Sequence, residues 1–166
     1  MRKRKRLTGQ MKAGGASGSP DVVWRLTENH VVDAVCRYLQ TRGFEIVERA
    51  TTAQRGRDVL ARRDSPRGPI ELAVEAKGAT SSKPGTQRHG KPFNSNQVLS
   101  HVARAFYTAA SIEAPAYAAI ALPNTPIHQA RVAAIDSALD RLGISLLWVG
   151  ANDSVEVKGR FEEGTT

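Results

Sequence analysis

The sequence predicts an α/β fold in which helices flank a mixed β-sheet. Three observations lead to this expectation. Apolar residues recur at helical spacing in three segments, shorter apolar runs typical of strands lie between them, and glycine or proline separates most of the segments. The expected order is helix, three strands, helix, strand, helix, strand, with helices packed on both faces of the sheet.

The first helix and the first three strands are expected in the N-terminal half. Thr27 can cap a helix of about 27–42, whose apolar positions lie three and four residues apart and end before Gly43. A short connection rich in turn residues, 65–69, predicts an antiparallel hairpin between the second and third strands. The three strands are expected at 44–49, 58–63 and 69–77.

The second half begins with a polar loop, 78–94, that contains almost no apolar residues. A second helix is expected to start at Ser95 or Asn96, with its apolar stripe facing the sheet. The remaining elements are a covered strand, a helix, a second covered strand and a short edge strand, at 116–122, 126–142, 144–149 and 155–157.

Length and composition fit one globular domain with a basic N-terminal tail. The chain has 166 residues and a formal net charge of +8, and its composition is 40% hydrophobic. We assign the domain to 21–158, a disordered basic tail to 1–20 and a flexible C-terminus to 159–166. The tail holds six Lys and Arg residues and no acidic residue, followed by a Gly- and Ser-rich stretch. It is either an arm that neutralises nucleic-acid phosphates or a solubilising terminus.

Several protein classes are excluded or disfavoured by composition. No stretch approaches the roughly 18 consecutive apolar residues of a membrane span, and no apolar segment follows the basic N-terminus. We therefore expect no membrane association and a cytoplasmic location. The lone Cys36 excludes an internal disulfide and a cysteine-based zinc cluster, and we interpret it as a packing residue.

Three charged residues, Asp58, Glu75 and Lys77, lie at the ends of expected strands. Successive side chains of a strand point to opposite faces, so Glu75 and Lys77 share one face while Val74 and Ala76 take the other. A glycine and the long polar loop follow, which indicates an exposed strand end. The alternative is an ordinary ion pair, because a glutamate and a lysine two residues apart occur often by chance.

The element order and these charges resemble the PD-(D/E)XK nuclease superfamily, whose fold is called restriction-endonuclease-like. The resemblance covers about 24–150 and rests on Gly56-Arg57-Asp58-Val59 and on Val74-Glu75-Ala76-Lys77-Gly78. The proline that names the motif is absent. Arg57 stands in its place, at a position that varies across the superfamily.

The resemblance implies a role for each matching position. Asp58 and Glu75 would be metal ligands, and the backbone carbonyl of Ala76 would add an oxygen. Glu28 matches a glutamate that often lies in the first helix, and Gln97 matches a polar residue near the scissile phosphate. For Glu28, a charge that complements the helix dipole is the alternative, and both roles are compatible.

Phosphodiester hydrolysis needs positive charge at the phosphate and an activated water. A hard cation such as Mg²⁺ supplies both when carboxylates hold it, and we expect Mn²⁺ to substitute for it. Lys77 would either help to deprotonate the attacking water or act only as a positive charge. The sequence leaves both roles open.

Basic residues near this site are expected to contact the DNA backbone. For the two on the second helix, a plain solvated face is the alternative. With no separate recognition domain, we expect weakly specific or structure-directed cleavage, or dependence on a partner protein or a homodimer for cuts in both strands. The expected contacts are Lys83, Arg88, Lys91, His101 and Arg104.

The sequence thus predicts a metal-dependent DNA endonuclease, a hydrolase acting on phosphodiester bonds. The alternative is a non-catalytic DNA-binding module of the same fold that recruits a partner protein. An α/β enzyme with another substrate is less favoured, because the chain lacks a glycine-rich phosphate loop, a nucleophile elbow and a cysteine–histidine pair.

Overall fold

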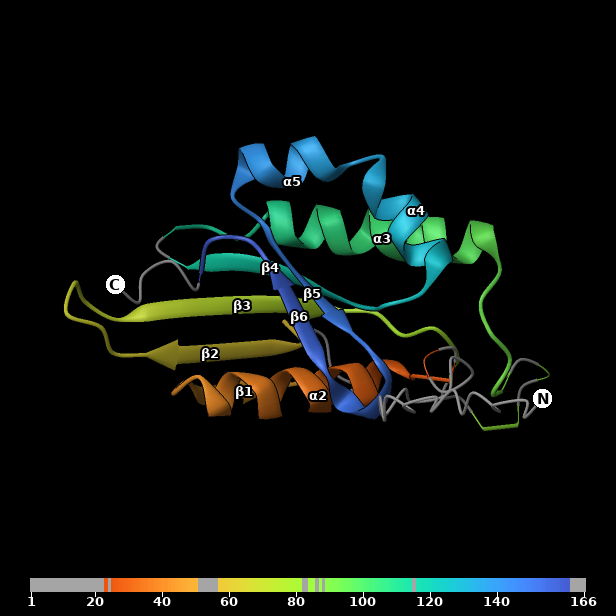
Figure 1. The fold of residues 1–166 in the computed structure, drawn as a ribbon, viewed down its shortest axis with the longest axis horizontal. Helices are drawn as coiled ribbons and strands as arrows, with labels where there is room; N and C mark the ends of the chain where they lie inside the picture. Colours follow the sequence, from red (N-terminus) through yellow and green to blue (C-terminus); the bar gives the residue numbers. More distant parts are fainter. Residues whose placement is uncertain are drawn as a thin grey trace, which may run out of the picture.

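The described part of the chain forms a single mixed sheet between two layers of helices (Figure 1). The computed structural model describes residues 23, 25–50, 57–81, 84–85, 87, 89–114 and 116–161. The expected tail 1–20 and residues 162–166 of the expected flexible C-terminus lie outside these ranges. No helix among the described residues is long and apolar enough to cross a bilayer.

The six strands formed by the described residues lie side by side in the order in which they occur along the chain. The pairs β1–β2, β2–β3 and β5–β6 are antiparallel, whereas β3–β4 and β4–β5 are parallel. The mixed α/β class and the predicted hairpin are therefore confirmed. The strands are β1 (Glu45–Arg49), β2 (Val59–Arg63), β3 (Ile70–Ala76), β4 (Tyr117–Pro123), β5 (Ser145–Val149) and β6 (Val155–Lys158).

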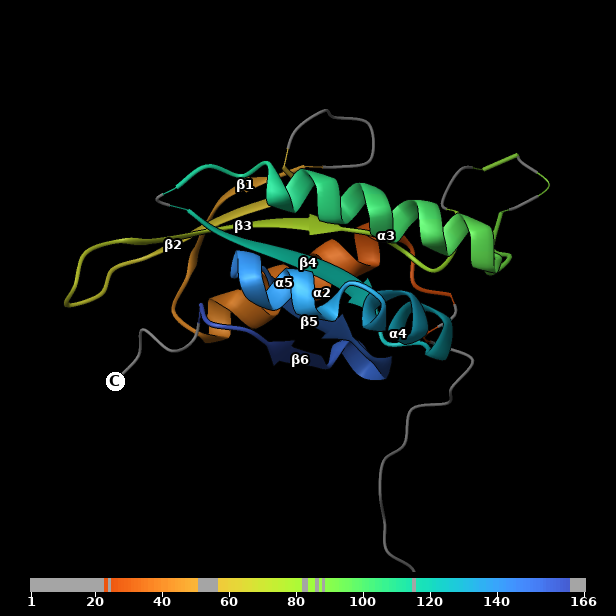
Figure 2. The same cartoon turned by 90° about the horizontal axis from the view of Figure 1, so that it is seen from above.

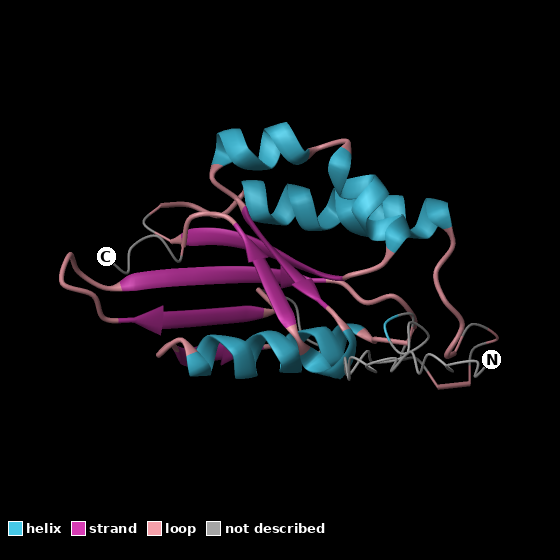
Figure 3. Cartoon of the chain, viewed as in Figure 1, coloured by secondary structure: helices cyan, strands magenta, loops and turns pink. Residues whose placement is uncertain are grey.

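The helices cover both faces of this sheet, as expected. Helix α2 (Glu28–Thr41) lies on one face, and α3 (Ser95–Ala110) lies on the other beside α4 (Pro126–Ala133) and α5 (Asp136–Leu142) (Figures 1 and 3). Seen from above, α3 runs along the sheet next to β3 and β4 (Figure 2). Two separate apolar cores result, one on each side of the sheet.

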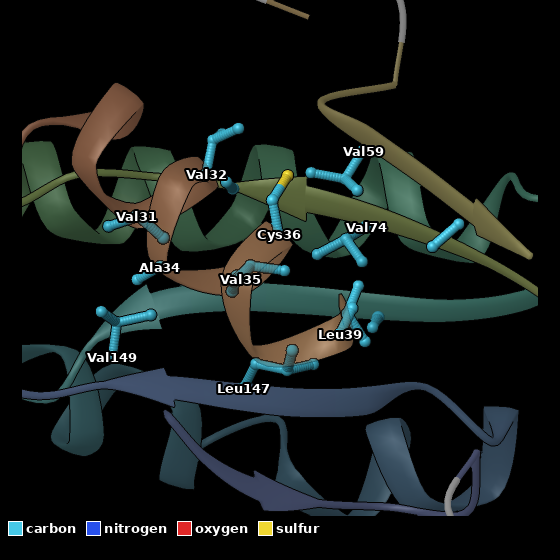
Figure 4. Packing of buried hydrophobic residues seen from close by; sticks show 14 of the residues in the cluster. Val31, Val32, Ala34, Val35, Cys36, Leu39, Val59, Val74, Leu147 and Val149 are labelled. Carbon is cyan, nitrogen blue, oxygen red and sulfur yellow. The ribbon is translucent and has the colours of Figure 1, made fainter. Parts of the chain in front are cut away.

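The core beneath the sheet depends on the apolar stripe of α2. Val31, Val35 and Leu39 are fully buried, and they point from the helix toward strand residues that include Val74 and Leu147 (Figure 4). Cys36 is buried in the same core with a free thiol, as expected of a packing residue. This packing holds the N-terminus of α2 near the end of β3, where the charged residues gather.

The single helix expected at 126–142 is wrong, because two helices occupy this segment. The backbone leaves the helical conformation at Ile135, where φ is −118° and ψ is 5°. Neither glycine nor proline marks the break, and apolar residues continue through it. Val132 before the break and Leu139 after it are both buried in the core on the α3 side of the sheet. Each short helix therefore turns its own apolar side to the sheet.

The packed region extends beyond residue 158, where the flexible C-terminus was expected to begin. Phe161 is only 1% exposed and packs edge-on against Phe44, with ring centroids 6.2 Å apart. Residues 159–161 therefore belong to the folded domain. The sequence hid this contact, because a single aromatic residue after a glycine has no periodic pattern.

Candidate functional site

The antiparallel pairing of β2 with β3 brings Asp58 next to the end of β3. Val59 pairs with Val74, and Asp58 directly precedes Val59. The backbone N–H of Ala76 donates a hydrogen bond of 2.7 Å to Asp58 Oδ2. Asp58 is thus fixed by the sheet, and one of its carboxylate oxygens is already used to hold the strand end.

Glu28 reaches the same place because α2 begins there. Thr27 caps the helix with its side chain, and Glu28 is the first helical residue. The chain leaving β3 runs against this helix end, since the N–H of Ala79 donates a 2.7 Å hydrogen bond to the carbonyl of Leu26. Gly78 makes this approach possible, because a Cβ at that position would lie 2.5 Å from the backbone nitrogen of Glu28.

The ammonium of Lys77 lies at the centre of the charged residues. Lys77 Nζ donates hydrogen bonds of 2.6 Å to Glu75 Oε1 and 2.7 Å to the carbonyl of Ala76. It also forms ion pairs of 3.6 Å with Glu28 Oε2 and 3.8 Å with Asp58 Oδ2. The structure therefore brings together four of the sequence-predicted residues, which we call the Lys77 cluster: Glu28, Asp58, Glu75 and Lys77.

Burial within the Lys77 cluster alters its proton equilibria. The pKa of Glu75 is raised by burial, against the hydrogen bond and the charge of Lys77, which lower it. The pKa of Glu28 is raised for the same leading reason. A carboxylate near other carboxylates is harder to ionise, and the ammonium compensates only part of this cost.

The pKa of Lys77 moves in the direction that keeps it charged. Burial alone would lower the pKa, but the hydrogen bond to Glu75 and the three nearby carboxylates outweigh burial and raise it. With a raised pKa, the Lys77 side chain stays protonated at neutral pH and has no free lone pair to accept a proton from water. Of the two roles that the sequence left open, this arrangement favours a positive charge.

The oxygens around the ammonium are those that the sequence assigned to a metal ion. Asp58, Glu75 and the carbonyl of Ala76 are hard donors of the type that Mg²⁺ prefers, and all three contact a cation. Around the ammonium, however, no group of three His, Cys, Asp or Glu residues in the described ranges is arranged to hold a metal ion. The donor chemistry fits a hard cation, provided that the ammonium leaves its position.

A cleft borders the Lys77 cluster on the side of α3. Its volume is about 490 Å³, and it is lined by Glu75 and Lys77 on the strand side and by Arg104 and Tyr107 on the helix side. Tyr107, which is 75% exposed, is not among the residues predicted for the site from the sequence. A large aromatic residue outside the apolar stripe of a helix was the available signal.

Gln97 is used in a helix cap. Its Oε1 accepts a 3.0 Å hydrogen bond from the backbone N–H of Asn94, while the Asn94 side chain accepts from the backbone of Gln97. No hydrogen bond between described residues joins Gln97 to the Lys77 cluster. The pattern Asn94-x-x-Gln97 is a capping box that the sequence analysis could have recognised.

The expected DNA contacts differ in their surroundings. Arg104 is exposed on the wall of the cleft, and Lys91 is exposed in the loop before α3. Lys83 and Arg88 lie outside the described residues. His101 is half-buried, and burial, with the charges of Lys77 and Arg104, lowers its pKa. His101 is therefore mainly uncharged at neutral pH, so a phosphate contact from it would rely on a ring N–H.

A second histidine near this end of the sheet was not singled out in the sequence. His128 in α4 is fully buried, and its Nδ1 lies 2.7 Å from Thr125 Oγ1. Burial lowers its pKa to about 4, with a smaller contribution from His101, while the backbone of Gly78 acts in the opposite direction. His128 is thus a neutral group buried within the packed part of α4.

Comparisons of this chain with family models, with curated proteins and with solved structures found no match. The function of this chain is therefore inferred from the geometry of the Lys77 cluster and its cleft.

Proposed function

We propose that this protein is a Mg²⁺-dependent DNA endonuclease of the PD-(D/E)XK type, with a restriction-endonuclease-like fold. The observation that carries the proposal is the convergence of three carboxylates and one backbone carbonyl on a single ammonium at the end of β3, beside an open cleft. A structural ion pair needs one carboxylate for one ammonium. Three carboxylates leave an excess of negative charge, which a divalent cation would offset.

Asp58, Glu75 and the carbonyl of Ala76 would hold the ion, which would supply positive charge at the scissile phosphate and acidify a water. Lys77 would then move toward the cleft and stabilise negative charge on the phosphate. Glu28 would orient Lys77 or a water from the opposite side.

The test is a nicking assay on supercoiled plasmid with Mg²⁺, Mn²⁺ or EDTA. We expect nicking with either metal and none in EDTA, and a loss of about 100-fold or more in Asp58→Asn and Lys77→Met. Asparagine keeps an acceptor for the N–H of Ala76, so Asp58→Asn removes the charge while the strand end stays in place.

Asp64→Asn is the matched control, because Asp64 is exposed in the turn after β2. It should nick like the wild-type protein. Equal nicking by wild type, Asp58→Asn and Lys77→Met would assign the activity to a contaminant or to another site and would contradict the proposal.

A second candidate, a DNA-binding module without turnover, is favoured by a separate observation. The ammonium already occupies the position between the carboxylates, and the described residues contain no ready-made metal group. Such a module would bind DNA equally well with Mg²⁺ or EDTA and would keep its affinity in Glu75→Gln. A wild-type protein that binds but never nicks would select this function over the first.

A further inference from the structure

The exposed ring of Tyr107 is hard to explain by folding alone. The side chain is 75% exposed on α3, whereas the buried stripe of that helix consists of residues such as Val98, Val102 and Ala105. Tyr107 adds nothing to the core beneath α3. An aromatic face left in water is available to stack on a flat ligand.

Among the described residues, Tyr107 lines two clefts that meet at this helix. The first, of about 490 Å³, also contains Glu75 and Lys77. The second, of about 650 Å³, also contains Glu71 on β3 and Arg57 in the segment before β2. A ligand that extends along this surface from Glu75 toward Glu71 would therefore pass the ring.

An arginine side chain lines each of the two clefts beside the Tyr107 ring. Arg104 lies three residues before Tyr107 on the wall of the first cleft, and Arg57 is exposed in the second. Neither guanidinium forms an ion pair with another described residue. Unpaired arginines beside an aromatic face are the combination by which proteins grip phosphates while a base stacks.

The second cleft also contains acidic groups, which restrict how a strand could lie there. Glu71 and Glu113 would repel phosphates, but a carboxylate accepts hydrogen bonds from the amino groups of bases. Bases would therefore face these carboxylates, and the backbone would follow the arginines.

We propose that Tyr107 stacks on an unpaired base, and that single-stranded DNA is the ligand this surface takes. The faces of bases inside a duplex are covered by their neighbours, so an exposed ring gains little from a duplex. The proposal deepens the proposed function by naming its substrate class, and it depends on the clefts rather than on the metal ligands.

The test measures binding without cleavage. Fluorescence anisotropy in EDTA would compare a labelled single-stranded oligonucleotide with the matching duplex, using wild type, Tyr107→Ala and Tyr107→Phe. We expect tighter single-strand binding by wild type, a loss of about 10-fold or more in Tyr107→Ala and near-normal affinity in Tyr107→Phe. A 2-aminopurine base in the strand should be quenched by wild type and not by Tyr107→Ala.

Tyr117→Ala is the matched control, since Tyr117 is 41% exposed and lines a different cleft with Leu142. It should bind like wild type. The stacking proposal is overturned if Tyr107→Ala keeps wild-type affinity for the single strand, or if it loses duplex and single-strand affinity equally.

The two proposals fail separately. Absence of nicking with Tyr107-dependent single-strand binding would refute the nuclease and support the stacking site. Metal-dependent nicking of plasmid with no effect of Tyr107→Ala on single-strand affinity would support the nuclease and refute the stacking site.

Discussion

The backbone at Gly78 lies directly against the backbone of Glu28. A Cβ added at Gly78 would meet the nitrogen of Glu28 at 2.5 Å and the carbonyl carbon of Thr27 at 2.7 Å. Real Cβ atoms do not approach other atoms this closely, and backbone cannot rotate away as a side chain can. The position of Glu28 in the Lys77 cluster therefore depends on a missing side chain after Lys77.

Gly78→Ala should push α2 away from the end of β3. We expect a loss of about 1–3 kcal/mol in the free energy of unfolding, as for overpacked cores, and a fall in nicking because Glu28 moves. Urea denaturation and the plasmid assay measure the two effects. Gly68→Ala is the control: Gly68 has a φ of +111° with nothing near its absent Cβ, so alanine there should reduce stability by strain and leave nicking unchanged.

Lys77→Met should leave three carboxylates facing one another without a cation. We expect a loss of about 2 kcal/mol in stability at neutral pH, less than for a fully buried charge, because the side chains of the Lys77 cluster keep some exposure. Added Mg²⁺ should raise the melting temperature of this variant more than that of wild type.

Lys158→Met provides the comparison, because Lys158 pairs with Asp136 on the surface, far from the cluster in the sheet. Its melting temperature should respond to Mg²⁺ as wild type does. An equal response of Lys77→Met and Lys158→Met would show that the carboxylates attract no divalent ion.

Buried His128 should make the protein less stable in acid. Its pKa is lowered from 6.5 to about 4 in the fold, so the unfolded chain binds a proton more readily than the native protein. Stability from this group is complete above about pH 6.5 and is lost as the pH falls toward 4, with a total of about 3 kcal/mol. His101 should contribute in the same direction.

Urea unfolding between pH 4.5 and pH 7.5 (roughly the window of these pKa shifts) would measure this slope. His128→Asn keeps a partner for Thr125 Oγ1 and should flatten the slope, whereas His89→Asn, at an exposed position, should not. A slope that persists unchanged in His128→Asn would mean that other groups control the acid sensitivity.

Phe161→Ala should destabilise the domain although it lies close to the C-terminus. The side chain is 1% exposed against Phe44, and truncating a buried phenylalanine typically costs about 3–5 kcal/mol. Thermal unfolding of Phe161→Ala and of the exposed-tyrosine variant Tyr117→Ala would separate burial from the loss of an aromatic ring. A melting temperature of Phe161→Ala equal to wild type would contradict the packing.

Most helices and strands could be predicted because their apolar periodicity is local. The apolar stripe of α2 and the apolar run of β4 can be recognised from the amino-acid sequence alone. The break between α4 and α5 could not be predicted, because it arises from how Val132 and Leu139 pack and has no glycine or proline signal.

The candidate site was predictable to the same extent. The alternation of a strand placed Glu75 and Lys77 on one face, and their 2.6 Å hydrogen bond confirms this geometry. The approach of Gly78 to α2 and the clefts beside Tyr107 depend on contacts between distant segments, which no local pattern encodes. Gln97 was assigned by resemblance, and its capping role came from a local motif that had been overlooked.

The strands lie in the sheet in chain order, so the two halves of the sequence contribute different parts of the candidate site. All four members of the Lys77 cluster come from residues 28–77, at the start of α2, just before β2 and at the end of β3, whereas the far wall of the cleft comes from α3. Substitutions on the outer face of α3 can therefore change which ligand is admitted while the charged groups keep their arrangement. Selection or engineering could alter ligand preference through residues of α3 while the Lys77 cluster in the N-terminal half stays unchanged.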